Sequence, residues 1–329
     1  MKKFILFIAV LSSLLACDDK NGKVLLPTSI GRYNELMVVI NQADWDGKIG
    51  LALKKVIASN VLGLPQPETQ FAITHIPHQG FDGFLKHNRN ILSIEQGKES
   101  ELIIEFDVYS KPQVYMHLKG PDKEAIAKLI KENKDLIIKA FKESDIKQIQ
   151  KDLRKKVHKT ELVKTFKEQG YSLKIPMDYT QVDDTGNFIW YRKEIQVYNA
   201  KINGSMNIIS YTLPLEIPFE QLKDSVASIR DMIGKKHIPG AIEGSYLITE
   251  AAYAPHIFED KLDGKEAYKV KGKWEVYKDF MAGPFVSYIV NDTKNKRIVV
   301  VEGFTYAPVV KKRDLMFELE AIIRTLHIE

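Results

Sequence analysis

The chain has 329 residues, of which 44% are hydrophobic and 28% charged, and this composition excludes a disordered or collagen-like protein. The single cysteine excludes an intrachain disulfide framework and a thiolate zinc cluster. The formal net charge is only +5, and after the first 16 residues no apolar run approaches the roughly 20 residues that span a bilayer.

The N-terminus has the features of a secretory signal peptide. A basic start at Met1-Lys2-Lys3 precedes a mostly apolar stretch over residues 4–15. The following Leu14-Leu15-Ala16-Cys17 resembles the lipobox of bacterial lipoproteins, which implies cleavage after Ala16 and acylation of Cys17, with palmitate among the acyl chains. The alternative is an ordinary signal peptide, or an uncleaved anchor, with an incidental cysteine. We expect a mature chain held at a membrane, because several acyl chains anchor firmly where one holds marginally.

A polar tether over residues 17–30 is expected to lead into an N-terminal α+β domain over residues 31–145. The acidic pair Asp18-Asp19 resembles an inner-membrane retention signal of enterobacteria and a surface-export signal of Bacteroidota lipoproteins. Apolar or alternating segments predict strands at 36–40, 71–76, 101–108 and 112–119. Helical spacing between the first two strands predicts a helix with an apolar face formed by Ile49, Leu53, Val56 and Ile57.

Residues 122–169 are predicted to be helical, beginning after Pro121, and residues 146–169 are expected to connect the two domains. Between residues 120 and 169 the sequence has 14 lysines and arginines against nine acidic residues. This basic segment could bind anionic lipid or an acidic partner. The alternative is that it forms a helix face exposed to solvent, with no binding role. It lacks the interleaved aromatic residues that stack on nucleic-acid bases, so no nucleic-acid partner is expected.

A C-terminal α+β domain is expected over residues 170–329. Apolar segments predict strands at 172–175, 179–182, 188–191, 206–211, 246–249, 267–276, 286–291 and 297–301. Helical spacing predicts helices at 218–233 and 312–326, and Asp183 to Asn187 is a turn signal. The whole pattern predicts an α+β fold of two domains with mostly antiparallel sheets, joined by the basic helical segment.

Several segments resemble a family of uncharacterised Bacteroidota outer-membrane lipoproteins. They are Glu35-Leu36-Met37-Val38-Val39-Ile40 with Trp45-Asp46-Gly47, Gly186-Asn187-Phe188-Ile189-Trp190, Gly272-Lys273-Trp274 with Met281-Ala282-Gly283-Pro284-Phe285, and Val301-Glu302-Gly303-Phe304-Thr305-Tyr306-Ala307-Pro308. The resemblance implies a lipid-anchored protein of the outer membrane, on its periplasmic or its cell-surface face. It implies no activity, because the family brings no catalytic residues to transfer.

No motif in the sequence specifies a reaction. His75 and His78 lie three apart on an extended segment and would point to opposite faces, which disfavours a metal site. Asp183 and Asp184 belong to a turn signal rather than a carboxylate pair. Nucleophile-elbow and phosphate-loop motifs are absent from the sequence, and no metal or cofactor is expected.

Three tryptophans, Trp45, Trp190 and Trp274, lie beside turn or glycine residues. Exposed, they could contact a sugar ligand or a protein partner; packed, they are core residues. We therefore expect a non-enzymatic envelope lipoprotein that binds an outer-membrane protein or another envelope component. The alternatives are a lipoprotein that binds a glycan or a small molecule and, less favoured, an envelope hydrolase without a recognisable motif.

Overall fold

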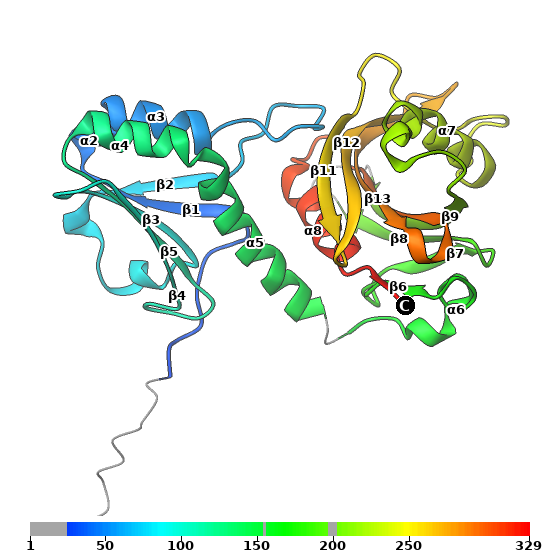
Figure 1. Cartoon of the computed structure of the whole chain (residues 1–329), viewed down its shortest axis with the longest axis horizontal. Helices are drawn as coiled ribbons and strands as arrows, with labels where there is room; N and C mark the ends of the chain where they lie inside the picture. The colour runs from blue at the N-terminus through cyan, green and yellow to red at the C-terminus, as the bar shows by residue number, and fades with distance from the viewer. Residues whose placement is uncertain (1–24, 154–155, 197–202) are drawn as a thin grey trace, which may run out of the picture.

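The computed structural model describes residues 25–153, 156–196 and 203–329, so Ala16 and Cys17 lie outside the described residues. The described chain forms two domains (Figure 1). A long helix, α5 (Lys134–Leu153), runs from the first domain along the side of the second. Among the described helices, none is long and apolar enough to cross a bilayer.

The N-terminal domain is a five-stranded sheet with two helices packed on one face. Its strands are β1 (Glu35–Val39), β2 (Ala72–Ile76), β3 (Asn90–Gln96), β4 (Glu101–Phe106) and β5 (Val114–Gly120), in the order β2-β1-β3-β5-β4. The covering helices are α3 (Lys48–Ile57), which follows the short α2 (Gln42–Trp45), and α4 (Lys123–Glu132). As its spacing predicts, α3 buries Ile49, Leu53, Val56 and Ile57 against the sheet.

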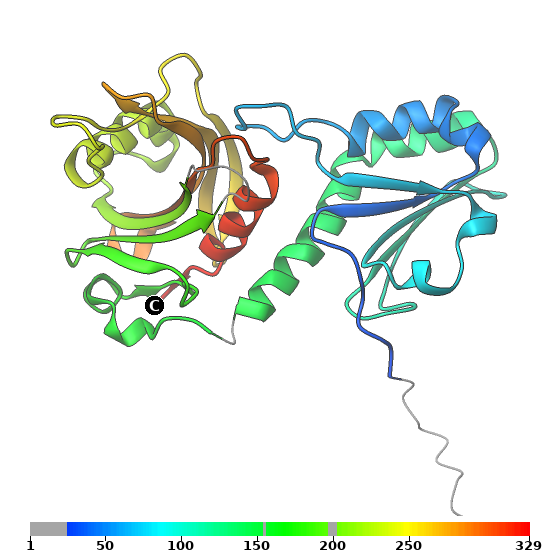
Figure 2. The same cartoon turned by 180° about the vertical axis from the view of Figure 1, so that it is seen from behind.

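The C-terminal domain is built on a strongly curved antiparallel sheet (Figure 2). The order β10-β12-β13-β14-β9-β8-β7 is formed by β7 (Thr180–Asp184), β8 (Phe188–Gln196), β9 (Asn203–Pro214), β10 (Tyr246–Thr249), β12 (Lys265–Tyr277), β13 (Ala282–Asp292) and β14 (Arg297–Tyr306). A further strand, β11 (His256–Leu262), pairs with β12 as a hairpin. Helix α8 (Arg313–Ile323) packs on one face and α7 (Val226–His237) on the other. The chain enters this domain through η4 (Thr160–Leu162), α6 (Lys164–Gln169) and β6 (Tyr171–Ser172), which pairs with β15 (His327–Ile328).

The expected α+β fold is confirmed, with local differences. In the N-terminal sheet β1 pairs in parallel with β2 and β3, and β3 in parallel with β5, so only the β4–β5 pair is antiparallel. The helix expected at 218–233 begins as the 3₁₀ helix η5 (Phe219–Ser225). Asp183 and Asp184 end strand β7 instead of belonging to the turn. Helix α4 is capped by Asp122, which follows Pro121 and accepts a hydrogen bond from the Ala125 amide.

A buried ion pair joins α7 to β14 inside the C-terminal domain. The guanidinium of Arg230 donates to both carboxylate oxygens of Glu302 at 2.8–3.0 Å, and both side chains are almost fully buried. The Arg230 guanidinium also lies 4.0 Å from the ring centre of Phe285 and donates to the Thr249 hydroxyl. This paired geometry lets two charges stay inside the core, because each charge offsets much of the desolvation of the other.

Candidate functional site

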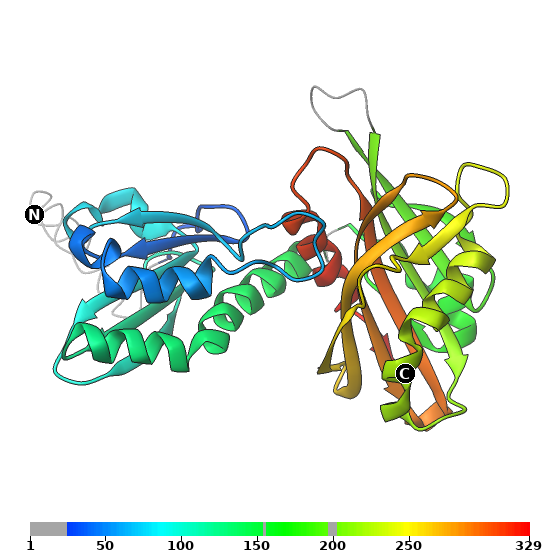
Figure 3. The same cartoon turned by 90° about the horizontal axis from the view of Figure 1, so that it is seen from above.

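The two domains meet where α5 lies against α8 (Figures 1 and 3). Ile146 and Ile149 of α5 pack with Phe317 and Ala321 of α8 in one small apolar cluster. Beside this cluster, the Gln150 side-chain amide donates to the Ala321 carbonyl at 3.0 Å. Burial of these side chains holds the domains together through the hydrophobic effect, and the hydrogen bond fixes how the two helices align.

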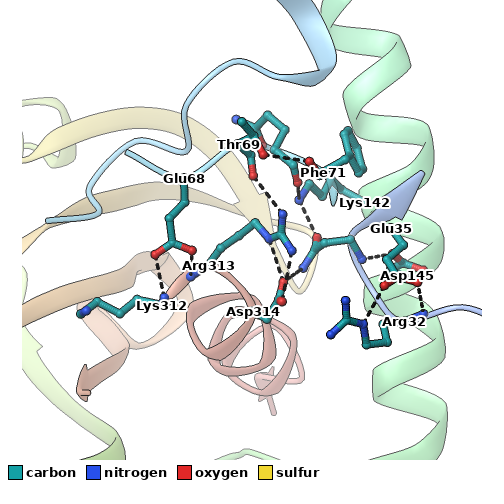
Figure 4. A network of polar contacts seen from close by, with 12 residues as sticks. Arg32, Glu35, Glu68, Thr69, Phe71, Lys142, Asp145, Lys312, Arg313 and Asp314 are labelled. Carbon is teal, nitrogen blue, oxygen red and sulfur yellow. Dashed lines mark hydrogen bonds and ion pairs between the residues drawn. The ribbon is translucent and has the colours of Figure 1, made fainter. Parts of the chain in front are cut away.

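A loop of the N-terminal domain also reaches across and caps α8 (Figure 4). Glu68, between α3 and β2, accepts hydrogen bonds from the backbone amides of Lys312 at 2.7 Å and Arg313 at 3.1 Å. Helix α8 has no side-chain cap of its own, since the residue at its N-cap is Lys312. The Glu68 carboxylate therefore satisfies two free amides at the positive end of the helix, although it belongs to the other domain.

Asn34 is the centre of a polar junction with Lys142, Asp145 and Asp314, three side chains that Figure 4 labels. It is fully buried and adopts a left-handed backbone conformation with φ 59°, which asparagine tolerates better than most residues. Its side-chain amide donates to Asp314 of α8 at 2.8 Å, and its side-chain oxygen accepts from the ammonium of Lys142 at 2.5 Å. Its backbone amide donates to Asp145 at 2.9 Å. One residue thus joins β1, α5 and α8.

Next to this junction lies a cleft of about 790 Å³ lined by both domains. The N-terminal domain contributes one turn of the α3–β2 loop and the outward side of α5, and the C-terminal domain contributes the β11–β12 hairpin, β13 and α8. Gly63 of the loop has φ +83°, and a Cβ atom there would lie 3.1 Å from the Gly272 amide nitrogen of β12. The loop therefore crosses the hairpin at a distance that only glycine allows without strain.

The cleft has an apolar side and a lysine cluster. The apolar side consists of Leu62, Leu64 and Phe258, of which Leu62 is 47% exposed and Phe258 40% exposed. The lysine cluster consists of Lys142, Lys269 and Lys271. Lys269 and Lys271 are two residues apart on β12, so they share one face, and Phe258 is the cross-strand partner of Lys269. The apolar side and the lysine cluster are therefore adjacent.

A single carboxylate serves two members of the lysine cluster. Glu320 of α8 is bound by the ammonium of Lys269 and lies 3.3 Å from that of Lys271. Burial alone would raise the pKa of the Glu320 carboxyl, but these two ammonium groups hold its pKa well below the ordinary value. Arg324, at the end of α8, is fully engaged elsewhere, with both terminal nitrogens on Glu143 at 2.8 and 2.9 Å.

Lys142 has no carboxylate oxygen within 4 Å among the residues that the structure describes. Its ammonium donates to Asn34 and, at 2.6 Å, to the Gln70 carbonyl, and lies 4.6 Å from the ring centre of Phe71. Burial and the neighbouring cations Arg313 and Lys271 lower the pKa of Lys142 to about 7. The nearby carboxylates Asp145 and Glu320 offset these effects only in part, so Lys142 gives up its proton far more readily than an ordinary lysine.

The three tryptophans named as possible contacts for a ligand or partner are in different elements, and none lines the cleft. Trp45, in α2, stacks on His75 with ring centres 4.7 Å apart. Trp190, in β8, is partly buried and donates to the Asn207 side chain at 3.0 Å. Trp274, in β12, is 2% exposed and packs edge-on against Phe304, so its indole offers no surface to a ligand in this conformation.

The other sequence candidates have structural partners. The ring nitrogens of His75 and His78 contact the carbonyls of Ile40 and Ile94, both at 2.9 Å. The Asp184 carboxylate accepts from the first backbone amides of α6, a helix-capping arrangement. Within the described part of the chain, no group of three metal-ligating side chains is close enough to hold an ion.

Comparison with protein families matches both domains. Residues 158–325, slightly more than half of the chain, match the model described as Domain of unknown function (DUF4837). The chain belongs to the DUF4837 family. Residues 29–154 match the model described as Domain of unknown function (DUF8532). The cleft thus lies between a DUF8532 domain and a DUF4837 domain, and the expected membership of an uncharacterised family is confirmed. Its lipoprotein character and its assignment to Bacteroidota stay predictions.

No curated protein matches this DUF4837 chain. Among solved structures, the Ran-binding protein Mog1p of Saccharomyces cerevisiae is 10% identical with a TM-score of 0.32, over 48% of this chain and 90% of that one. LpqN of Mycobacterium tuberculosis, described as involved in cell envelope biogenesis, is 15% identical with a TM-score of 0.28, over 48% and 82%. A Bacteroides thetaiotaomicron protein is 14% identical with a TM-score of 0.25, over 49% and 45%. Similarities at this level carry no functional argument.

Proposed function

We propose that this DUF4837 protein is a lipid-anchored envelope protein that binds a small molecule in the cleft between its two domains. The cleft is the observation that carries the binding role. Its volume of about 790 Å³ falls in the range of roughly 300–1,000 Å³ typical of small-molecule sites, which often lie at domain junctions. Both domains supply its lining, and the contacts of Glu68 and Asn34 hold those domains in one arrangement.

The anchor is the part of the proposal that rests on the sequence. Cys17 follows Leu14-Leu15-Ala16 at the end of an apolar signal, which is where lipoprotein acylation requires a cysteine. The proposed location is the outer membrane, through acyl chains on Cys17. The polar tether that follows would leave the two-domain body free of the bilayer, so the cleft needs no apolar outer surface to stay near the membrane.

The anchor is tested by labelling cells with an alkyne analogue of palmitate and fractionating their membranes. The wild-type chain should take up the label and sediment with the outer membrane, and Cys17→Ser should do neither. Ser13→Ala, four residues earlier in the signal, serves as the control and should behave as wild type. An unlabelled wild-type chain, or membrane association that survives Cys17→Ser, would refute the anchor. Protease treatment of intact cells then distinguishes the cell-surface face from the periplasmic face.

The binding role is tested separately by native mass spectrometry of the full chain purified from its own membranes. A bound small molecule should appear as an added mass on the wild-type protein. Leu62→Trp fills the cleft from its apolar side without changing any charge, and it should abolish the added mass. Phe84→Trp, an exposed site in the N-terminal domain outside the cleft, should retain it. A wild-type protein without added mass, or one whose added mass survives Leu62→Trp, would contradict binding in the cleft.

A second candidate function is attachment to an envelope protein, which the sequence favoured. One observation supports it: Phe280, in the turn between β12 and β13, is fully exposed, and Tyr277 beside it is also exposed. Exposed aromatic side chains are frequent anchors in protein interfaces. A photo-crosslinking amino acid at position 280 should then capture an outer-membrane protein in living cells, whereas the same group at exposed position 99 should not. Equal capture at both positions would reject this candidate.

A further inference from the structure

We infer that the ligand of the cleft is an amphiphilic organic anion, with its acidic group on the lysine cluster and its apolar body on the apolar side. The inference rests on the proposed function, because it names the ligand class of the same cleft. It follows from three features of the described residues: an excess of basic over acidic side chains in the lining, lysine side chains that line the cleft, and exposed apolar side chains directly beside them.

The charge balance comes first. Lys269 and Lys271 share the carboxylate of Glu320, and Lys142 has no carboxylate within 4 Å in the described part of the chain. Among the described residues, the lining of the whole cleft has seven lysine and arginine side chains against five carboxylates, so basic groups are in excess. Positive charges gathered in a partly buried space repel one another more strongly than on an open surface, because the effective dielectric constant is lower. An anion in the cleft would relieve this repulsion.

The available donors indicate the type of anion. The two arginines that line the cleft are already engaged, Arg324 with Glu143 and Arg313 with Asp314. The other basic side chains of the lining are lysines, whose ammonium groups act as compact point charges with three donors each and have no planar fork. Such groups suit a phosphate, sulfonate or carboxylate head bound by charge. They give little selectivity for a planar bidentate partner.

The apolar side accounts for the rest of the ligand. Leu62 and Phe258 both line the cleft and are 47% and 40% exposed, so an apolar group bound there would remove part of their surface from water. Phe258 is paired across the strands with Lys269, so the apolar and charged contacts lie within one side-chain width of each other. A ligand that satisfies both must combine an acidic head with an adjoining apolar body.

The test uses isothermal titration calorimetry on the purified full chain in a maltoside detergent, with hexyl phosphate as the probe. Inorganic phosphate has the charge without the apolar body, and hexyl glucoside has the apolar body without the charge. We expect hexyl phosphate to bind at least tenfold more tightly than either. Vesicles with and without an anionic phospholipid then show whether the head is recognised on a membrane lipid or on a free molecule.

Substitutions assign the binding to the lysine cluster. Lys271→Gln and Lys142→Gln should each weaken the affinity for hexyl phosphate at least tenfold. Lys147→Gln removes the same charge from an exposed position on α5 and should leave the affinity unchanged. Lys142 hydrogen-bonds to Asn34 and Gln70 at the domain junction, whereas the ammonium of Lys271 is paired with Glu320 of its own domain, so Lys271→Gln keeps the test valid where Lys142→Gln disturbs folding.

Three results would overturn the inference: equal binding of hexyl glucoside, equal weakening by Lys147→Gln, or no binding of hexyl phosphate at millimolar concentration. These results differ from failure of the proposed function. A protein with an added mass that Leu62→Trp abolishes, but with an affinity for hexyl phosphate that Lys271→Gln leaves unchanged, would have a ligand in the cleft that is not an anion.

Discussion

Removing the carboxylate of Glu68 should loosen the start of α8, although the two are in different domains. In the structure this carboxylate accepts from the backbone amides of Lys312 and Arg313 at 2.7 and 3.1 Å, and it is 9% exposed. Glu68→Ala leaves both amides without an acceptor. Glu68→Gln keeps one acceptor oxygen and loses the charge. We therefore expect both variants to destabilise α8, and Glu68→Ala more than Glu68→Gln.

The size of the effect follows from what the carboxylate supplies. Loss of a side-chain cap costs about 0.5–2 kcal/mol. Loss of a negative charge at a helix N-terminus costs about 0.3–1 kcal/mol, and somewhat more where the charge is partly buried. Since Glu68 provides both, Glu68→Ala should lower the free energy of local opening of α8 by about 1–3 kcal/mol. Glu68→Gln should fall near the lower end of this range.

Hydrogen exchange measured by mass spectrometry on the full chain tests this prediction. Peptides covering residues 312–318 should exchange about 5- to 150-fold faster in Glu68→Ala, at a tenfold change per 1.4 kcal/mol. Glu99→Gln, on an exposed loop of the N-terminal domain, should not alter them. Unchanged exchange at the start of α8 would refute the capping argument. Faster exchange confined to the N-terminal domain would refute it too, because Glu68 would then act only within its own domain.

Three further predictions concern stability. Arg230→Met leaves the Glu302 carboxylate buried without its cation and should lower the free energy of unfolding, measured in urea, by about 3–5 kcal/mol. Adding Glu302→Leu should recover most of this loss. A loss below about 1 kcal/mol would contradict the pairing. Gly63→Ala should lower the melting temperature more than Gly264→Ala. Both glycines have positive φ, but only at position 63 would the added Cβ atom lie close to the backbone of another segment. Equal losses of melting temperature would mean that this close approach does not affect stability. Glu320→Gln should be less stable than wild type at pH 7, and the difference should narrow progressively as the pH falls below about 4.5. The reason is that a carboxyl group with a depressed pKa in the folded protein contributes stability at pH values above its ordinary pKa, near 4.5, and loses that contribution as the pH falls toward its lower folded pKa. A difference independent of pH would reject the ion pair.

Helices and strands could be predicted from the sequence where burial of one face makes apolar residues recur at regular spacing. The spacing of Ile49, Leu53, Val56 and Ile57 predicts which face of α3 is buried. The spacing of the apolar residues in α8 predicts the buried face of that helix in the same way. The direction of strand pairing could not be obtained in this way. A buried apolar strand such as β1 has the same pattern whether its neighbours run parallel or antiparallel, since both faces are covered.

The candidate site could not be predicted from sequence patterns either, for a different reason. Lys269 and Lys271 alternate with apolar residues along β12, and such a pattern normally indicates a solvent-facing side of a strand. Lys142 is one of many cations in a basic helical segment, with nothing local to distinguish it. What gives these side chains a common role is the docking of α5 and the α3–β2 loop on the C-terminal domain, which depends on contacts between residues far apart in the chain.

The cap on α8 also has a consequence for the order of events during synthesis. Glu68 is made 244 residues before the amide that it caps, so the N-terminal domain can fold long before its partner helix exists. The cleft is complete only when α8 has emerged, because this helix supplies part of its lining. A chain that stops before α8 would lack the cleft and also an apolar layer of the C-terminal domain core, so binding in the cleft would report that synthesis has passed α8.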